Sequence, residues 1–456
     1  MNPNIYVFLI IVFFFFITKN LASSDTGYFK TEKIQGSTTL TLSFFASGMG
    51  LWILTSPAEV GWYGLGFDVL GYAISAATPF LLLYFFGPKI ANLTTEGTTL
   101  PEFLRSKFGN GAQKLVSGIA SVYMFTFLIA ELASIYLVFP VLYPEFGIEV
   151  VILIAFGSLL YLFKSGFKAS LITDRIQGVA IIGMLSYLIY KLLRSSNYSE
   201  IINNANLGGF NEFTFFSFKS ALAVIIAVTG AEIFSQGYWQ RTFSAKNSSV
   251  IKKSSIYAAL LCFVTVYILG FFGTVGAGMG LDNPTLSFVQ QFEFNPVFSS
   301  IFLILATLLV LSSVDTLQNA IAATLTIDIF ESNKKTGQLL TIILTISAVF
   351  FSTKVENIFT LFLLADLFTA LIVVPTFFQF KKSLTSKSFM IIFVLGAVST
   401  LFYRFLFVDN EINPGGLFIP TDIYGLADLN TFLVAITSTL IGCLISDRIK
   451  NENCRF

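Results

Sequence analysis

The chain is dominated by long apolar stretches that are separated by short polar connections. Most stretches hold about 20 residues, which in a helix is enough to cross a lipid bilayer. The pattern predicts an all-α polytopic membrane protein with about 13 transmembrane helices. The apolar segments lie near residues 4–20, 37–56, 63–86, 113–140, 148–163, 168–193, 214–236, 254–280, 298–329, 337–353, 357–380, 388–407 and 431–447.

The first segment is short for a membrane span and could also be the apolar core of a signal peptide. A signal peptide carries basic residues before its apolar core, and no basic residue precedes this segment. We therefore expect residues 1–24 to be retained and the segment to form an extra N-terminal helix.

The basic residues predict the orientation of the helices, because Lys and Arg concentrate in cytoplasmic loops. If the N-terminus lies outside, 22 of the 27 Lys and Arg residues fall in loops on the inner side. The C-terminus then also lies inside. One inner connection, TLPEFLRSKFGNG, begins with Thr99 and Pro101, which predicts a short helix with an N-cap at the membrane surface.

The composition supports a membrane protein and excludes several other classes. Of 456 residues, 55% are hydrophobic and 12% are charged, against roughly 25% charged in soluble domains. The net charge of +1 argues against a nucleic-acid partner. There is no histidine, and the cysteines Cys262, Cys443 and Cys454 lack the spacing of a metal site. The expected partners are the bilayer and a small-molecule solute.

A polar stripe interrupts the apolar segment 298–329. If this segment is helical, its polar residues share one face. A carboxylate in the middle of a bilayer costs about 2.5–3.5 kcal/mol even on lenient insertion scales, so this face should line a protein cavity. The residues of the stripe are Ser312, Asp315, Thr316, Asn319 and Thr326.

Two other segments carry glycines near their midpoints. Gly48 and Gly50 flank Met49 in the second segment, and Thr229–Gly230 precedes Glu232 in the seventh. Transporters bind ions and substrates where helices break at such positions in two inverted repeats. The two segments are five helices apart, as a five-plus-five repeat requires. The alternative is that these glycines only allow close helix packing.

Several side chains within the spans are candidates for the substrate site. Glu131 lies in mid-span and could recognise a substrate amine or amide, exchange a proton or bond a buried hydroxyl. Asp366 is a candidate for gating or packing, and Glu59 and Asp68 are expected near the wet outer face. The substrate-side candidates are Trp52, Glu131, Thr229, Glu232 and Asp315.

Four motifs resemble those of the sodium/solute symporter family. They are LSSVDTLQNA with TIDIF in the polar stripe, SGFKASLITDRIQ at 165–177, TLPEFLRSKFG at 99–109 and YWQRTFSAKN at 238–247. They occur in the order found in the family, and the resemblance covers roughly residues 28–380. Within the family, the chain looks most like the urea-permease or proline-symporter branches. Gly48 stands where proline-type members have Asp, which weakens the second assignment.

The resemblance implies a leucine-transporter type of fold with two inverted repeats, residues 37–193 and 194–380. Residues 1–36 would add a helix and a linker, and residues 381–456 two helices and a short tail. It also implies alternating access in the cell membrane and a sodium ion as coupling ion. The implied sodium ligands are the carbonyls of Ala46, Met49 and Leu309 and the hydroxyls of Ser312 and Ser313.

The resemblance further matches Asp174 to a residue near the inner sodium exit, although Asp174 and Arg175 could simply form a solvated pair. The chain shows no nucleophile–base pair and no phosphate-binding loop, so an enzyme is not expected. We expect a sodium-coupled symporter that imports a small polar organic solute. The alternatives are proton-coupled uptake of urea or another small solute through the same fold, and a non-transporting membrane sensor or partner subunit.

Overall fold

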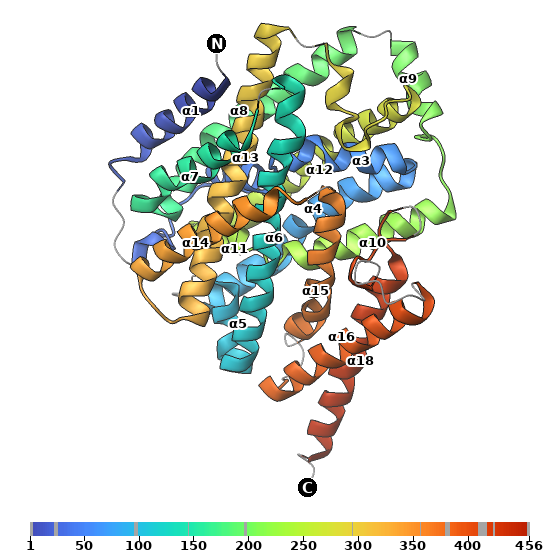
Figure 1. Ribbon diagram of the computed structural model, residues 1–456. Coiled ribbons are helices and arrows are strands. Elements are labelled where there is room, and N and C mark those ends of the chain that lie inside the picture. The colour runs from blue at the N-terminus through green and yellow to red at the C-terminus, as the bar shows by residue number, and fades with distance from the viewer. Residues whose placement is uncertain are drawn as a thin grey trace.

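A computed structural model describes residues 3–21, 26–94, 99–144, 146–195, 198–293, 295–355, 357–378, 384–408, 417–422 and 425–453 of the chain. Helices account for nearly all of the regular structure in these ranges, and no extended strand occurs among them. The helices form one bundle, with α16 (Ser386–Phe407) and α18 (Leu429–Asn453) packed together at one edge (Figure 1).

Most helices of the first half of the chain coincide with the expected apolar segments. The helices of this half are α1 (Pro3–Thr18), α2 (Ser37–Gly48), α3 (Ser56–Tyr63), α4 (Gly66–Leu93), α5 (Leu100–Phe108), α6 (Asn110–Leu142), α7 (Ile148–Ser165) and α8 (Phe167–Ser195). Of these, α3 and α5 lie between the expected segments. A 3-10 turn, η2 (Leu51–Leu54), joins α2 to α3, and another, η1 (Thr26–Tyr28), follows α1.

The second half begins with a short helix, α9 (Tyr198–Leu207), that lies outside the expected spans. Then follow α10 (Phe215–Glu232), α11 (Gln236–Ser244), α12 (Ser248–Gly278), η3 (Pro284–Leu286), η4 (Val289–Gln291), α13 (Pro296–Thr324), the π-helical turn η5 (Leu325–Ile329), α14 (Lys334–Ser352) and α15 (Ile358–Phe378).

Eleven helices of the described residues are long and apolar enough to cross a membrane. A twelfth span would be the bent pair Ser37–Gly48 and Leu51–Tyr63, whose halves meet at 65°. The remaining apolar helix, Asn4–Thr18, is shorter than the others. The all-α membrane architecture is thus confirmed, while the crossing by the first helix and the direction of the termini stay predictions.

The helix that carries the polar stripe lies inside the bundle. The helix α13 packs against α6, α7, α8 and α14 (Figure 1). Of an 18-residue apolar stretch within the span Pro296–Ile329, 78% is buried inside the protein. Asn295 caps its start by accepting a hydrogen bond from the Phe298 N–H at 2.9 Å. All five stripe residues are buried, which confirms that this face avoids lipid.

The inner connection between α4 and α6 forms the expected surface helix. Thr99 and Glu102 form a capping box at the start of α5, with Thr99 accepting from the Glu102 N–H at 3.2 Å. The Thr99 hydroxyl also donates to Asp328 on η5 at 2.9 Å, and the Gln113 amide of α6 donates to the same carboxylate oxygen at 2.8 Å. One carboxylate therefore ties the end of the α13 span to α5 and α6.

Two acidic residues expected near the wet outer face are buried instead. Glu59 accepts a hydrogen bond from the Asn357 side chain, which ties α3 to the residues before α15. Asp68 accepts from the Leu65 N–H at 2.8 Å and closes the first turn of α4. The expectation of exposure was wrong because both carboxylates find donors in neighbouring turns.

Candidate functional site

The helix expected to break at Gly48–Gly50 does break there. The α2 helix ends at Gly48, and the chain passes through Met49 and Gly50 before η2 begins at Leu51. On the far side of the break, the Leu51 N–H donates to the Glu131 carboxylate of α6 at 2.9 Å. A helix start bears unpaired N–H groups and partial positive charge, so a carboxylate stabilises it. Glu131 therefore holds the second half of the broken helix in place.

The two glycines at this break are required by close packing. A Cβ atom at Gly50 would lie 1.8 Å from the Glu131 Oε1 atom, and one at Gly48 would lie 2.9 Å from the Tyr238 hydroxyl oxygen. Any side chain at these positions would collide with a functional group that faces the break. The absence of Asp at position 48 is explained by Tyr238, which occupies the adjoining space.

The second break lies slightly later than expected. The α10 helix continues through Thr229 and Gly230, ends at Glu232, and α11 starts at Gln236. The Trp239 indole donates to the Ile233 carbonyl at 2.6 Å and so satisfies a backbone group that the break frees. The expectation of a break at Thr229–Gly230 was wrong, because Gly230 remains part of the helix. A Cβ atom at Gly230 would make only an ordinary van der Waals contact with Val373, so no close approach requires a glycine there.

A cavity opens beside both breaks. It lies among the first broken helix, α4, α6, α10, α11 and α15. Its polar and aromatic lining comes from Trp52, Tyr72, Ser75, Phe80, Tyr123, Phe127, Glu232, Tyr238, Phe359, Phe362 and Asp366.

A second cavity of about 340 Å³ of empty space adjoins the first. The two share six lining residues, namely Gly48, Trp52, Tyr123, Phe127, Glu232 and Tyr238. The second cavity also reaches Glu131 on α6 and Ser313 and Thr316 on α13. The two cavities thus adjoin each other, and together their linings reach from α15 to the polar stripe of α13.

The five residues implied as sodium ligands are all buried. The Ser312 hydroxyl donates to the Leu309 carbonyl at 2.8 Å, so its lone pairs remain available. The Ser313 hydroxyl, which lines the second cavity, makes no hydrogen bond within the described residues. Ala46 and Met49 lie on the first broken helix, which packs against α13. The donor set consists of neutral oxygens, which suits a monovalent hard cation better than a divalent ion.

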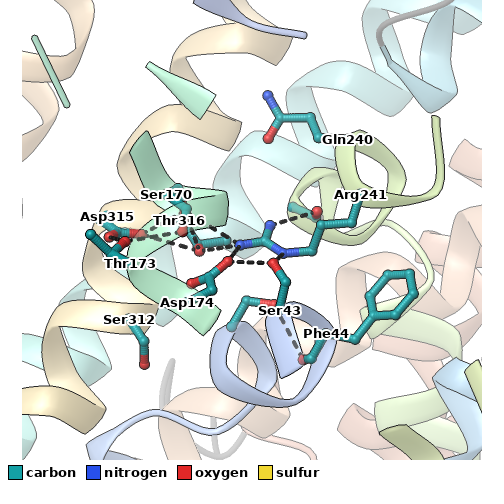
Figure 2. A network of polar contacts seen from close by, with 12 residues as sticks. Ser43, Phe44, Ser170, Thr173, Asp174, Gln240, Arg241, Ser312, Asp315 and Thr316 are labelled. Carbon is teal, nitrogen blue, oxygen red and sulfur yellow. Dashed lines mark hydrogen bonds and ion pairs between the residues drawn. The ribbon is translucent and has the colours of Figure 1, made fainter. Parts of the chain in front are cut away.

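A buried ionic network lies next to this region (Figure 2). The guanidinium of Arg241 on α11 pairs with Asp174 of α8 at 2.5 Å, and both side chains are fully buried. The same group donates to the Ser43 hydroxyl of α2 at 2.7 Å and to the Thr316 hydroxyl of α13 at 2.8 Å. Ser43 in turn donates to Asp174. One arginine therefore connects four helices that surround the break.

Asp315 belongs to this network and does not line either cavity. Its carboxylate accepts hydrogen bonds from the Ser170 hydroxyl at 2.8 Å and the Thr173 hydroxyl at 3.2 Å (Figure 2). It also accepts one from the Tyr161 hydroxyl at 2.9 Å. With three donors from α7 and α8, this carboxylate is occupied by the protein itself. A substrate-side role of Asp315 therefore stays a prediction.

The other substrate-side candidates divide between the cavities and the packing. Trp52 and Glu232 line both cavities, and Glu131 lines the second. Thr229 bonds to the Thr78 hydroxyl of α4 and lines neither cavity, because it lies on the face of α10 that packs against α4. Its assignment to the substrate side also stays a prediction.

Several important residues could not be found by reading local motifs. Asp174 was paired with Arg175 as one option, yet its partner is Arg241, which lies 67 residues along the chain. Asp366 was taken as a gating or packing residue, yet it lines the first cavity. Tyr123 had no signal beyond its occurrence in an apolar helix, where aromatic residues mostly pack. Tyr238 begins the motif at 238–247, but the motif gave no indication that its side chain lines a cavity.

A bent helix whose halves meet beside a polar cavity, and a buried central helix with free hydroxyls, define a secondary transporter. The chain belongs to the sodium:solute symporter family, whose sequence model matches residues 28–351. It is thus a multi-pass plasma-membrane protein that couples the movement of a solute to sodium.

Relatives with known names agree with this assignment. A spermidine transporter of Candida albicans is 28% identical over 373 residues, which cover 78% of this chain and 70% of the relative. A sodium/proline symporter of Staphylococcus aureus is 24% identical over 348 residues, covering 72% and 67%. The human sodium/myo-inositol cotransporter 2 is 26% identical over 315 residues, and the match spans only 45% of its length.

Solved structures show the same fold. The substrate-bound outward-open state of a sodium-coupled sialic acid symporter matches with a TM-score of 0.76, 14% identity and coverage of 98% and 97% of the two chains. A closed nucleobase-cation-symport-1 family transporter matches with a TM-score of 0.59, 15% identity and coverage of 95% of each chain. These matches confirm the leucine-transporter type of fold.

Proposed function

We propose that this protein imports a small polar organic solute by alternating access and that one sodium ion binds between the first broken helix and α13. The carbonyls of Ala46, Met49 and Leu309 and the hydroxyls of Ser312 and Ser313 would hold the ion. The observation that carries this proposal is the Ser313 hydroxyl, which is buried beside the break and makes no hydrogen bond within the described residues. A buried hydroxyl without a partner is costly, and a bound cation would satisfy it.

The solute would bind in the two adjoining cavities beside the breaks. The relatives carry names that refer to spermidine, myo-inositol and proline. These are small molecules with polar groups, which fits a cavity with Trp52, Glu232 and Tyr238 in its lining. The cavity and the proposed ion site meet at Ser313, so that sodium and solute would stabilise the same arrangement of the broken helix.

The ion pair between Arg241 and Asp174 would close the inner side of this path. On the orientation expected from the basic loops, the C-terminus and the start of α8 lie inside. Sodium that leaves for the cytoplasm would pass Asp174. In this structure the Asp174 carboxylate is paired with Arg241 at 2.5 Å, so it is not available to the ion. Release to the inside would therefore require α11 to move away from α8. The same short helix carries Tyr238, so solute binding and inner closure would be coupled through α11.

The sodium site can be tested without knowing the solute. Sodium that binds only the folded protein should raise the melting temperature of the purified wild type in sodium chloride relative to potassium chloride. The double variant Ser312→Ala with Ser313→Ala should lose this sodium-specific shift. Ser299→Ala is the matched control on the same helix, because Ser299 is buried but distant from the break. An undiminished sodium shift in the double variant would contradict the assignment.

A further inference from the structure

Among the Asp, Glu, Lys and Arg residues, only acidic ones are found in the described lining of the two adjoining cavities. Asp366 lines the first cavity, Glu131 lines the second, and Glu232 lines both. No lysine or arginine is among the described residues that line either space. Arg241, the nearest buried cation described above, is engaged by Asp174 and by hydroxyls of α2 and α13. The cavities therefore present three acidic side chains with no basic side chain among their described lining residues.

Two of these carboxylates have oxygen atoms that no protein group satisfies. The Oδ2 atom of Asp366 and the Oε1 atom of Glu131 are buried and make no hydrogen bond within the described residues. Asp366 is 2% exposed and Glu131 is 0% exposed. An ionised carboxylate that is buried without a partner costs several kcal/mol, about as much as a bound cation could offset. The unsatisfied oxygens thus point to a ligand that is positively charged and can donate hydrogen bonds.

Aromatic rings cover the space between the carboxylates. Trp52 stands edge-on to Phe362, with ring centroids 5.8 Å apart, and Phe127 stacks on Phe362 at 4.2 Å. Tyr72, Tyr123 and Tyr238 complete the lining. The faces of such rings attract ammonium groups and their alkyl chains, whereas they offer nothing to an anion.

The arrangement of the carboxylates indicates the shape of the ligand. Asp366 lies at the α15 end, Glu131 at the α13 end, and Glu232 at the junction between the two cavities. A compact cation with one charge could satisfy only one of them. An extended alkyl chain with two or more ammonium groups could satisfy them together, with its methylene groups against the aromatic rings.

We propose that the transported solute is an aliphatic diamine or polyamine, held by Glu131, Glu232 and Asp366 and by the aromatic wall. This rests on the proposed function, because the ligand would occupy the same cavity and would move with sodium. It excludes neutral polyols and zwitterionic amino acids as the preferred solutes, since neither would neutralise three carboxylates.

Binding is tested first with the purified wild-type protein. Spermidine and putrescine should raise its melting temperature, n-butylamine should do so at roughly tenfold or higher concentrations, and myo-inositol and proline should have little effect. The single charge of n-butylamine removes at least one charge-assisted hydrogen bond, worth about 1.5–3 kcal/mol or roughly tenfold to 150-fold in affinity. No shift with spermidine, or a larger shift with myo-inositol or proline, overturns the inference.

Variants then assign the residues. Asp366→Asn and Glu232→Gln should each weaken spermidine binding by about tenfold or more, since each removes a charge from the ligand. Asp428→Asn is the matched control, because Asp428 pairs with Arg404 at α16 and α18 and lies outside both cavities. Equal affinities in all three variants overturn the inference.

Uptake separates this inference from the proposed function. Labelled spermidine is offered to wild-type proteoliposomes of neutral phosphatidylcholine, with sodium or potassium outside, so that the amine is not adsorbed by anionic lipid. Sodium-dependent uptake supports both proposals. Sodium-dependent uptake of proline or myo-inositol but not of spermidine overturns the polyamine and leaves the symporter. Spermidine uptake that is equal in potassium supports the polyamine and overturns the sodium coupling.

Discussion

The carboxylate of Glu131 accepts a hydrogen bond from the Leu51 backbone N–H at 2.9 Å, across the gap between α6 and the first broken helix. One oxygen of this side chain thus closes the start of a half-helix, and the other faces the second cavity without a partner. Glu131 therefore caps the half-helix with one oxygen and keeps the other as an acceptor without a partner. Substitutions of Glu131 can test the capping contribution by itself.

Replacing Glu131 by Ala should destabilise the protein by about 1–3 kcal/mol, because the buried Leu51 N–H loses its acceptor. Glu131→Gln keeps an amide oxygen at the same position and should retain most of the stability. Thermal or denaturant unfolding of the variants in detergent measures the difference. If the Ala and Gln variants melted alike, the cap would not contribute as described.

Replacing Gly50 by Ala should abolish transport, because the added Cβ would lie 1.8 Å from the Glu131 Oε1 atom. The carboxylate would have to leave its position, and Leu51 would lose its partner. Gly118→Ala on α6 is the control, since a Cβ there meets nothing within 4 Å. Uptake by proteoliposomes and the yield of folded protein are measured together. Combining Gly50→Ala with Glu131→Ala should recover folding, and a double variant as poorly folded as Gly50→Ala would argue against the clash.

Replacing Arg241 by Ala should cost about 3–5 kcal/mol of stability, because Asp174 would remain as a buried charge without its partner. Adding Asp174→Asn to this variant should restore part of the loss. Arg175→Ala should change little, since Arg175 is exposed on α8. The free energies of unfolding of the four proteins form the test. Equal losses of unfolding free energy in the Arg175 and Arg241 variants would contradict the stabilising role of the Arg241–Asp174 pair.

Arg241→Lys should fold but close poorly on the inner side. A lysine ammonium has three donors on one atom and cannot span Ser43, Asp174 and Thr316 as the planar guanidinium does. A cysteine introduced at Thr242 on α11 should then react faster with a polar thiol reagent than in the Arg241 protein. Equal reaction rates would show that the guanidinium geometry is not needed for closure.

Replacing Thr99 by Ala should destabilise the junction of α5, α6 and η5 by about 1–2 kcal/mol, because the N-cap of α5 is lost and Asp328 loses a donor. Thr99→Ser keeps the hydroxyl and should be close to the wild type. Thermal melting distinguishes the two variants. A Ser variant as unstable as the Ala variant would mean that the methyl group, and not the hydroxyl, holds this junction.

The sequence was sufficient for the features that are local. Apolar runs located the helices, Thr99 and Pro101 located the start of α5, and two glycines around Met49 located the first break. Each is encoded within a few consecutive residues, through propensity, capping or the lack of a side chain. The burial of the polar stripe was equally accessible, because a carboxylate at membrane depth has no stable alternative.

What the sequence could not supply are relationships between distant helices. The partner of Asp174 depends on how α11 packs against α8, and no spacing rule connects residues 67 positions apart. The hydrogen-bond partners of Thr229 and Asp315 could not be predicted for the same reason. Both lie on plausible faces, but the neighbouring hydroxyls of Thr78 and of Tyr161, Ser170 and Thr173 occupy them. The aromatic wall of the cavity becomes visible only when four helices are assembled.

The burial of Arg241 has an electrical consequence. Its guanidinium is fully enclosed between α8 and α13 and carries a permanent charge. A unit charge that crosses the whole bilayer exchanges about 2.3 kcal/mol with each 100 mV of membrane potential. If α11 moves this charge away from Asp174 when the inner path opens, part of a unit charge travels through the field. The empty protein would then respond to voltage by itself, and the resting potential would bias which side is open before any ion or solute binds.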